Sequence, residues 1–436
     1  MISKRLVRGI GFALVLIGGA LIGLALLRGS KGGAFWALPA PLDAASTSAP
    51  SPSGTITAAP PPTFTNTPQP LVPTRTAVPS TRTVLPTVVD PTVTSAAVDP
   101  PTAQKPTTEA FSTPTPSATP TVLTPDVSAY VVPPDERHRL GVSLPEGADR
   151  DYDLAPLEIG WVMDWNVRFS TSLDDEIDYA QTVRLWQGTL YPDAPTLTAV
   201  AAARPGSLWL ISNEPDVRWQ DNTPPDGYAV LYHEAYEAIK AGDPSAVVAV
   251  GGISQPTELR LRYLDLMLEA YRTRFGRPLP ADAWHIHNYM LREERDSWGV
   301  DIPPGLPDDT GMLYGIDDST NLELFRAQIL SFRRWMQDRS YGDLPLVVSE
   351  FGVPMPPDYG FPPDRVGHFL RETWRFFLSA TDPQLGLARD GGRLVQQWCW
   401  FSLGDANYPA GDLIDTQRGT GDWTPLALVW MEMVGR

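Results

Sequence analysis

The sequence predicts an α/β protein built on a (β/α)8 TIM barrel, preceded by an N-terminal membrane segment and a disordered linker. Two observations predict the barrel. The last 300 or so residues contain eight short apolar segments of strand type, and amphipathic helical patterns separate the later ones. Strands that are apolar on both faces and alternate with helices are typical of a parallel sheet covered by helices. Eight such units indicate a closed barrel.

The N-terminus, residues 1–30, has the pattern of a signal-anchor. An uncharged run of 19 residues at 9–27 is preceded by three basic residues and followed by two. A helix of this length can just cross a bilayer, and the heavier positive charge before it places the rest of the chain outside the cell. A single-pass membrane protein is therefore expected. A cleaved signal peptide, which would make the protein secreted, is the alternative.

Residues 31–134 are expected to form a disordered linker rich in proline, threonine and serine. From Pro39 to Pro134 the chain holds 22 of its 46 prolines. This composition offers too little apolar area to offset the entropy lost on ordering the backbone. The folded domain is therefore expected over 135–436, held clear of the membrane by the linker.

The expected elements of the folded domain follow in chain order. The strands cover 139–144, 158–165, 182–187, 207–213, 246–252, 283–289, 345–352 and 395–403. Helical patterns, with apolar residues three and four positions apart, cover 227–241, 258–275, 321–339 and 366–380. The connections after the first two strands are short and weakly helical. A doubly wound open sheet is therefore an alternative to the barrel.

Charge and cysteine content exclude several classes of function. The formal net charge is −17, from 51 acidic and 34 basic residues, which argues against a nucleic-acid partner. The single cysteine, Cys399, excludes an intrachain disulfide and any cysteine-based metal cluster, and we expect it to be a small buried residue. No cofactor and no metal is expected, and a monomer is favoured.

Two of the expected strands end in a glutamate. The fourth ends in Asn213-Glu214-Pro215, and the seventh carries Glu350 in the motif Ser-Glu-Phe-Gly. Glutamate is depleted in strands and costly to bury unpaired, whereas the reactive groups of a barrel lie at the C-terminal ends of its strands. Two carboxylates about 5 to 5.5 Å apart are what retaining glycoside hydrolysis requires. The pair therefore indicates a candidate active site.

These motifs and their strand positions resemble the clan A glycoside hydrolase superfamily, which includes cellulases, mannanases and xylosidases. The resemblance covers roughly residues 139–436. It implies a retaining hydrolase that cleaves O-glycosidic bonds, with β linkages favoured, in extracellular poly- or oligosaccharides. Glu214 would be the acid/base, Glu350 the nucleophile, and Asn213 a hydrogen-bond partner of the sugar 2-hydroxyl. A nucleophile that stays ionised should be supported by hydrogen bonds and a cation.

The sixth strand contains His285, His287 and Tyr289, which alternate along one face. The resemblance matches His287 and Tyr289 to a His-x-Tyr pattern whose tyrosine bonds to the nucleophile. His285 is expected to be a core residue. A pair of metal ligands at His285 and His287, as in metal-dependent barrel hydrolases, is the alternative, although it would need further ligands.

An arginine inside the third expected strand, Arg184, needs a carboxylate to offset its burial. The resemblance offers a role in supporting the nucleophile and binding substrate, and a structural salt bridge is the other interpretation. Arg168 is the alternative residue for the first role. Asp216 and Asp164 are each expected to be a loop or rim hydrogen-bond partner and not a catalyst.

The eighth strand supplies a candidate sugar platform. Members of the superfamily place a tryptophan there, and Trp400 fits this pattern because a Phe-Ser pair follows it. Trp398 on the same face is the competitor, and Trp165 and Trp219 are aromatic candidates in rim loops.

One further class of function is consistent with the sequence. A non-catalytic cell-surface protein could use the same barrel to bind carbohydrate. The longest insertion, 290–320 after the sixth strand, would either shape a sugar subsite or cover the barrel.

Overall fold

A computed structural model describes residues 131–145, 148–418 and 421–436. The expected membrane segment at 9–27 and nearly all of the expected linker lie outside these residues. Within the described part of the chain, no helix is long and apolar enough to cross a membrane. Val132, three residues before the expected start of the folded domain, is already buried, and its N–H donates to the carbonyl of Met433 at 2.7 Å.

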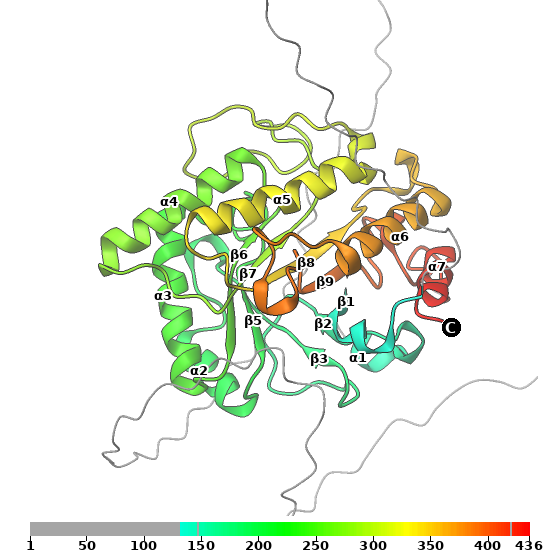
Figure 1. Cartoon of the computed structure of the whole chain (residues 1–436), viewed down its shortest axis with the longest axis horizontal. Helices are drawn as coiled ribbons and strands as arrows, with labels where there is room; N and C mark the ends of the chain where they lie inside the picture. Colours follow the sequence, from blue (N-terminus) through cyan, green and yellow to red (C-terminus); the bar gives the residue numbers. More distant parts are fainter. Residues whose placement is uncertain (1–130, 146–147, 419–420) are drawn as a thin grey trace, which may run out of the picture. The chain divides into compact units, whose positions relative to one another are not determined.

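The described residues form one parallel sheet of nine strands, of which all but β4 are labelled in Figure 1. The strands are β1 (Leu140–Ser143), β2 (Trp161–Met163), β3 (Asp178–Tyr179), β4 (Gln181–Val183), β5 (Leu208–Ile211), β6 (Val247–Ile253), β7 (Ala283–His287), β8 (Leu346–Gly352) and β9 (Gln397–Phe401). Their order across the sheet is β3-β2-β1-β9-β8-β7-β6-β5-β4. Every neighbouring pair is parallel.

The two edge strands of this sheet are halves of one strand. Only Ala180 separates β3 from β4 in the chain, while β3 pairs with β2 and β4 pairs with β5. The sheet therefore closes on itself, and β3 and β4 together make the third of eight barrel strands. The predicted barrel is confirmed, and the doubly wound alternative is wrong. In this count β5 is the fourth strand and β8 is the seventh.

The third strand lies earlier in the chain than the sequence predicts. The expected span 182–187 leaves the sheet after Val183, because the backbone of Arg184 turns to exchange two hydrogen bonds of 2.8 Å with Tyr191. The residues that pair with β2 are instead Asp178 and Tyr179. Asp178 is exposed and lies in a polar stretch, so the sequence there lacks the apolar pattern of a strand.

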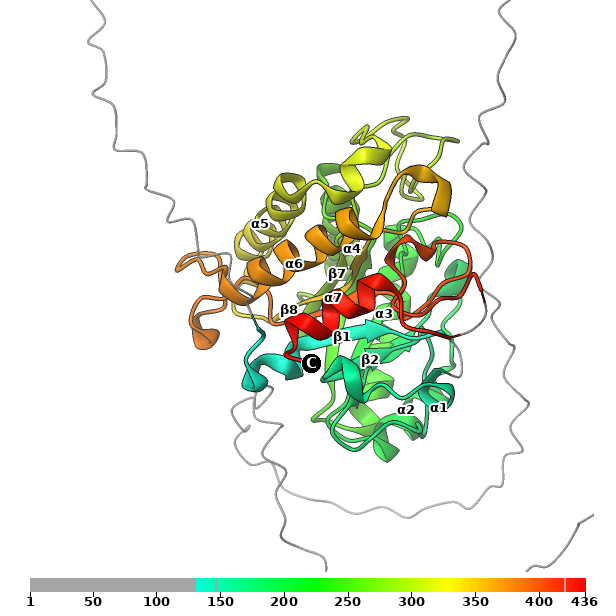
Figure 2. The ribbon, with the colours of Figure 1, turned by 90° about the vertical axis from the view of Figure 1, so that its right-hand side faces the viewer.

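The described residues contain seven α-helices, six between strands and one after β9. They are α1 (Ala148–Asp151), α2 (Ala194–Ala203), α3 (Pro225–Gly242), α4 (Glu258–Phe275), α5 (Leu322–Asp338), α6 (Pro363–Ser379) and α7 (Pro425–Met433). The four predicted helices correspond to α3, α4, α5 and α6, whereas α1, α2 and α7 were not predicted. Side chains cap the N-termini of α2, α5 and α7. Figure 2 shows α6 packed between α5 and α7 on the outside of the sheet.

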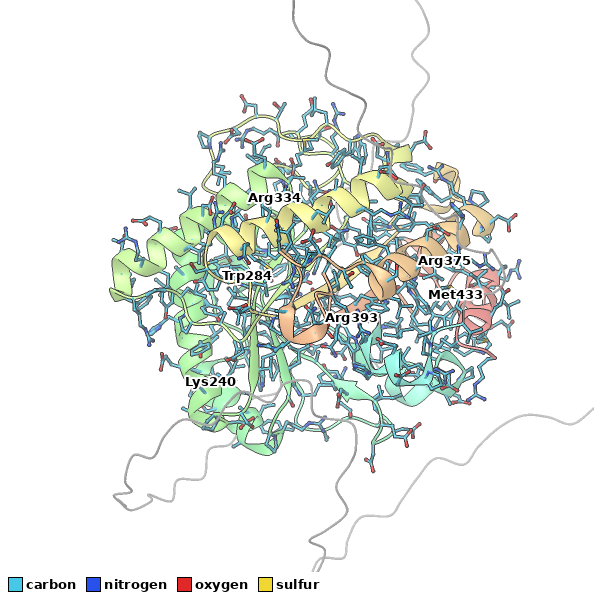
Figure 3. The ribbon with its side chains drawn as sticks, in the orientation of Figure 1. Lys240, Trp284, Arg334, Arg375, Arg393 and Met433 are labelled. Atoms are coloured by element: carbon cyan, nitrogen blue, oxygen red, sulfur yellow. The ribbon has the colours of Figure 1, made fainter. Side chains whose placement is uncertain are left out.

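The core has two parts because side chains alternate between the two faces of each strand. On β7, Trp284 points outward to α5, where its ring meets those of Phe332 and Trp335 edge to face (Figure 3). His285 and His287 point inward. Nearly all strand residues are buried, as expected for a sheet that helices cover.

Candidate active site

Glu214 lies in the turn that ends the fourth barrel strand, three residues beyond β5. Its φ is +49°, a backbone conformation that residues with side chains rarely adopt. The turn is held by a hydrogen bond from the Glu214 N–H to the carbonyl of Gly252 at 2.8 Å. A Cβ on Gly252 would come within 2.6 Å of the Ser212 carbonyl oxygen, so this close approach requires glycine.

A fully buried carboxylate, Asp221, fixes the same turn. It accepts hydrogen bonds from the Ser212 hydroxyl and the Asn213 N–H, both at 2.9 Å, and from the Leu185 N–H at 2.8 Å. It also pairs with the Arg184 guanidinium, with 2.6 Å between Nε and Oδ1. The sequence contained no pattern that marked Asp221.

Arg184 therefore belongs to a structural salt bridge and not to the catalytic pair. The expected role in nucleophile support is wrong for this reason, since its guanidinium is committed to Asp221. The alternative residue, Arg168, is paired with Asp164. Asp164 thus serves as a partner within its loop, as expected.

Strand β7 delivers His287 and the residue two positions beyond it, Tyr289, to the centre of the barrel. His287 Nδ1 lies 3.1 Å from Glu214 Oε1 and 3.5 Å from Glu350 Oε2. The Tyr289 hydroxyl donates to Glu350 Oε2 at 3.0 Å. The expected contact between this tyrosine and the seventh-strand glutamate is present in the structure.

His285 is a satisfied core residue. Its two ring nitrogens lie 3.0 Å from the Ser349 hydroxyl and 3.1 Å from the Ile211 carbonyl. Burial lowers the pKa of His285 to about 3, so the ring is neutral. Because both nitrogens are occupied, His285 and His287 do not form a pair of metal ligands.

Glu350, on β8, receives more hydrogen-bond donors than Glu214 does. The indole N–H of Trp165 donates to Oε1 at 2.6 Å, and Tyr289 donates to Oε2. Among the described residues, no lysine or arginine forms an ion pair with Glu350. In that part of the chain, neither a lysine nor an arginine therefore supplies the expected cation, and His287 is the basic side chain next to Glu350, with 3.5 Å between Nδ1 and Oε2.

The electrostatics of the centre couple its three ionisable groups. Burial raises the pKa of Glu350; the charge of His287 opposes the rise, the charge of Glu214 adds to it, and the hydrogen bonds from Trp165 and Tyr289 oppose it. Burial alone would lower the pKa of His287, but the charges of the two glutamates and the bond to Glu214 raise it. His287 is thus the basic side chain that faces both buried glutamates.

The two carboxylates are close together. One carboxylate oxygen of Glu214, one of Glu350 and a ring nitrogen of His287 all lie within 4.8 Å of one another. This spacing could hold a metal ion, but both oxygens of Glu350 and Nδ1 of His287 already have hydrogen-bond partners in the protein. A close pair of carboxylates is also the arrangement that retaining glycoside hydrolysis uses, with one acting on the anomeric carbon and the other on the glycosidic oxygen.

Asn213, next to Glu214, has a free acceptor. Its side-chain oxygen is buried without a hydrogen-bond partner, and its side-chain N–H₂ lies 3.4 Å from Gln220 Oε1. A buried polar atom without a partner is costly unless a ligand or water satisfies it.

Trp400 does not reach the site. Its ring is fully buried between Phe351 and Phe369 on the helix side of the sheet, and its N–H donates to the Gly411 carbonyl at 2.7 Å. The expected sugar platform at Trp400 is wrong, because alternation along β9 directs residue 401 inward instead. Phe401 lies edge to face with Trp165, with ring centroids 6.0 Å apart.

Trp398, the competitor, is also fully buried, and it stacks on Phe377 at a centroid distance of 5.1 Å. Trp219 stays a rim candidate, half-buried beside Arg218. The sequence did not predict Phe401, because the Trp-Ser pattern of the superfamily was matched to Trp400, the residue before it.

The long insertion at 290–320 is bonded to the loop of Glu214. Arg260 on α4 pairs with Asp216 and with Glu293 of the insertion, both at 2.6 Å, and all three side chains are fully buried. Arg260 also donates to the Asp301 carbonyl at 3.1 Å. Asp216 is thus a loop hydrogen-bond partner, as expected, because it accepts from the Ser254 hydroxyl at 2.7 Å. It is also a buried ion-pair partner of Arg260.

A cavity of about 500 Å³ lies between the loops that follow β8 and β9. Its lining includes Phe361, Ile414 and Asp412, but neither of the two paired glutamates. The two glutamates therefore lie outside this cavity.

The barrel and the paired carboxylates define the class of fold and site. It is a (β/α)8 barrel with a buried glutamate after the fourth strand and another on the seventh, the arrangement implied by the clan A resemblance.

Similar solved structures were found. One is a GH128 subgroup II endo-β-1,3-glucanase from Pseudomonas viridiflava, with 18% identity and a TM-score of 0.45, covering 67% of this chain and 96% of that one. A subgroup I endo-β-1,3-glucanase from Amycolatopsis mediterranei, in complex with laminaritriose, has 15% identity and a TM-score of 0.42, with coverages of 68% and 99%. A subgroup III curdlan-specific exo-β-1,3-glucanase from Blastomyces gilchristii has 16% identity and a TM-score of 0.42, with coverages of 68% and 98%. No family model and no curated protein matches the sequence.

Proposed function

We propose that this protein is a retaining glycoside hydrolase with Glu350 as nucleophile and Glu214 as acid/base. The observation that carries the proposal is the pair of buried glutamates whose carboxylate oxygens lie within 4.8 Å of each other at the centre of the barrel. This separation suits the double-displacement reaction, since inverting enzymes hold their carboxylates about 6.5 to 9.5 Å apart to admit a water molecule.

The division of roles rests on hydrogen bonding. An attacking carboxylate must be ionised, and donors favour that form. Glu350 accepts from Trp165 and Tyr289, whereas the close side-chain contact of Glu214 is to His287. Glu214 thereby keeps an oxygen available to carry a proton.

In the first step, a carboxylate oxygen of Glu350 bonds to the anomeric carbon while the bond from that carbon to the leaving oxygen breaks. The proton on Glu214 passes to the leaving oxygen. In the second step, Glu214 takes a proton from water, the water oxygen bonds to the anomeric carbon, and Glu350 leaves as a carboxylate. The sugar product keeps its anomeric configuration.

The substrate is a polysaccharide or oligosaccharide with O-glycosidic linkages, and β linkages are favoured. The unpartnered oxygen of Asn213 beside Glu214 is placed to accept from a sugar hydroxyl. Half-exposed Phe401 and Trp165 offer apolar ring surface of the kind that sugar C–H groups contact.

The proposal also includes the location and the oligomeric state of the protein. It is a monomer that a single membrane span anchors, with the barrel outside the cell. Fractionation of intact cells with surface proteolysis would test the anchoring.

The experiment uses a panel of β-linked glucans, mannans, xylans and galactans, with proton NMR of the first-formed product. We expect hydrolysis with retained anomeric configuration. Glu214→Gln and Glu350→Gln should each lower kcat/KM by at least about a thousandfold with unchanged circular dichroism. The matched control is Glu323→Gln, at a side chain that is 88% exposed, which should keep full activity.

Three outcomes would contradict the proposal. Glycan binding without any release of reducing ends would favour the carbohydrate-binding alternative. Inverted product would remove Glu350 from the nucleophile role. Loss of activity after chelation, with recovery on adding a divalent metal, would favour a metal-dependent hydrolase.

A further inference from the structure

We propose that Trp165 is a further catalytic residue, whose indole N–H holds one oxygen of the Glu350 carboxylate in the place where a cation was expected. The inference rests on the proposed function, because it assigns Trp165 a role in the chemistry of the same nucleophile. The contact is direct, at 2.6 Å between Nε1 and Oε1. A tryptophan side chain donates but cannot accept, so it favours the carboxylate form of its partner.

Each oxygen of Glu350 has its own neutral donor. Trp165 donates to Oε1 and Tyr289 donates to Oε2, and the Phe401 ring lies edge to face against both, at centroid distances of 6.0 and 6.4 Å. The three rings form one aromatic wall that ends in a donor on each side. The carboxylate is therefore held in one orientation about its last torsion, which is otherwise broad.

The backbone around Trp165 is fixed from both sides. Asp164 accepts from the Tyr179 hydroxyl and pairs with Arg168. Asn166 bonds through its carbonyl to the Thr182 N–H on β4 at 2.9 Å. Trp165 itself has a φ of +60°, an uncommon conformation that persists only where the surroundings determine it. The indole is thus positioned before any substrate arrives.

The arginines that could have taken this role are committed elsewhere. Arg168 is paired with Asp164, and Arg184 is paired with Asp221. The groups whose charge acts on Glu350 are His287 and Glu214, and the Cys399 thiol and Tyr289 hydroxyl also lie close by. Besides the charge of His287, support of the nucleophile therefore comes from two neutral donors, of which Trp165 makes the shorter bond.

The test replaces the donor and keeps an aromatic ring. Trp165→Phe removes the N–H, and we expect kcat/KM to fall roughly 10- to 100-fold, the usual effect of losing a hydrogen bond to a charged group. The acid limb of the pH profile of kcat/KM should move to higher pH, because the ionised form of Glu350 has lost a donor. The matched control is Trp335→Phe, which removes an indole bond of 3.0 Å to the carboxylate of Asp265 between α4 and α5. That control should leave the pH profile unchanged.

A second measurement needs neither the Trp165→Phe variant nor enzymatic activity. In the proton NMR spectrum of the wild-type protein, one indole N–H resonance should shift as Glu350 titrates, and this shift should be absent in Glu350→Gln. If no indole resonance follows Glu350, the inference is wrong. It is also overturned if Trp165→Phe raises KM alone while the acid limb stays in place, since Trp165 would then only contact the sugar. If the wild-type protein hydrolyses no glycan, the proposed function fails and the catalytic role of Trp165 fails with it, whereas the NMR result still reports on the contact.

Discussion

Arg184 provides a sharp test of the salt bridge that supports the turn of Glu214. Its guanidinium is 9% exposed and pairs with Asp221, which is fully buried. Removing one partner of a buried ion pair destabilises a protein by about 3 to 5 kcal/mol. We expect Arg184→Met to fall at the lower end, about 3 kcal/mol, because Asp221 keeps donors from Leu185, Ser212 and Asn213.

The loss converts to a change in thermal midpoint. Unfolding of roughly 300 residues carries an entropy of about 0.6 kcal/mol/K, so the midpoint should fall by about 5 °C. Differential scanning calorimetry measures this, and Arg272→Met, at a side chain that is 64% exposed, is the control expected to shift it by less than about 1.5 °C.

The same variant separates the two roles that the sequence left open. If Arg184 is structural, the acid limb of the pH profile of kcat/KM stays where the wild-type enzyme has it. An unchanged midpoint together with a displaced acid limb would refute the salt-bridge interpretation and return Arg184 to the nucleophile.

Two further predictions concern the aromatic wall and the charge balance of the centre. Phe401→Ala should raise KM several-fold at little cost in stability. Trp400→Phe should instead lower the free energy of unfolding by about 1 to 3 kcal/mol and leave KM unchanged. Steady-state kinetics and denaturant unfolding measure the two effects. The reverse pattern would restore Trp400 as the sugar platform. The raised pKa of Glu350 places the acid limb of kcat/KM above pH 4.5, and His287→Gln should move it higher because the charge of His287 holds that pKa down. The pKa of His287 is raised above 6.5 on folding, so its stabilising contribution is full below pH 6.5 and is lost as pH rises through the folded value. Thermal midpoints of wild type and His287→Gln measured across pH should therefore converge at alkaline pH, and parallel curves would contradict this.

The barrel could be predicted because its strands and later helices obey simple periodicities. Helix α4 was predicted with its observed bounds, because apolar residues recur regularly up to the glycine that ends it, Gly276, whose φ of +67° suits the C-terminal cap. The third strand could not be located, since the segment that pairs with β2 is short and partly polar. It consists of Asp178 and Tyr179. Burial there comes from tertiary pairing with β2 and not from local pattern.

The candidate site divides in the same way. Glu214, His287 and Glu350 were predicted to be close together because each belongs to the C-terminal end of a strand, and the structure brings them together. Asp221 and Arg260 act through long-range ion pairs, for which a single sequence has no local pattern. The choice between Trp400 and Phe401 depends on which face of β9 turns inward, and a one-residue difference reverses that answer.

Cys399 lies within the barrel and is the only thiol of the chain. Burial and the charge of Glu350 raise the pKa of its thiol well above the usual range, so the reactive thiolate is scarce while the barrel is closed. A thiol-specific reagent should therefore modify the protein only when the strands separate. The labelling rate at Cys399 reports how often the barrel opens, and it does so on the native sequence without an introduced probe.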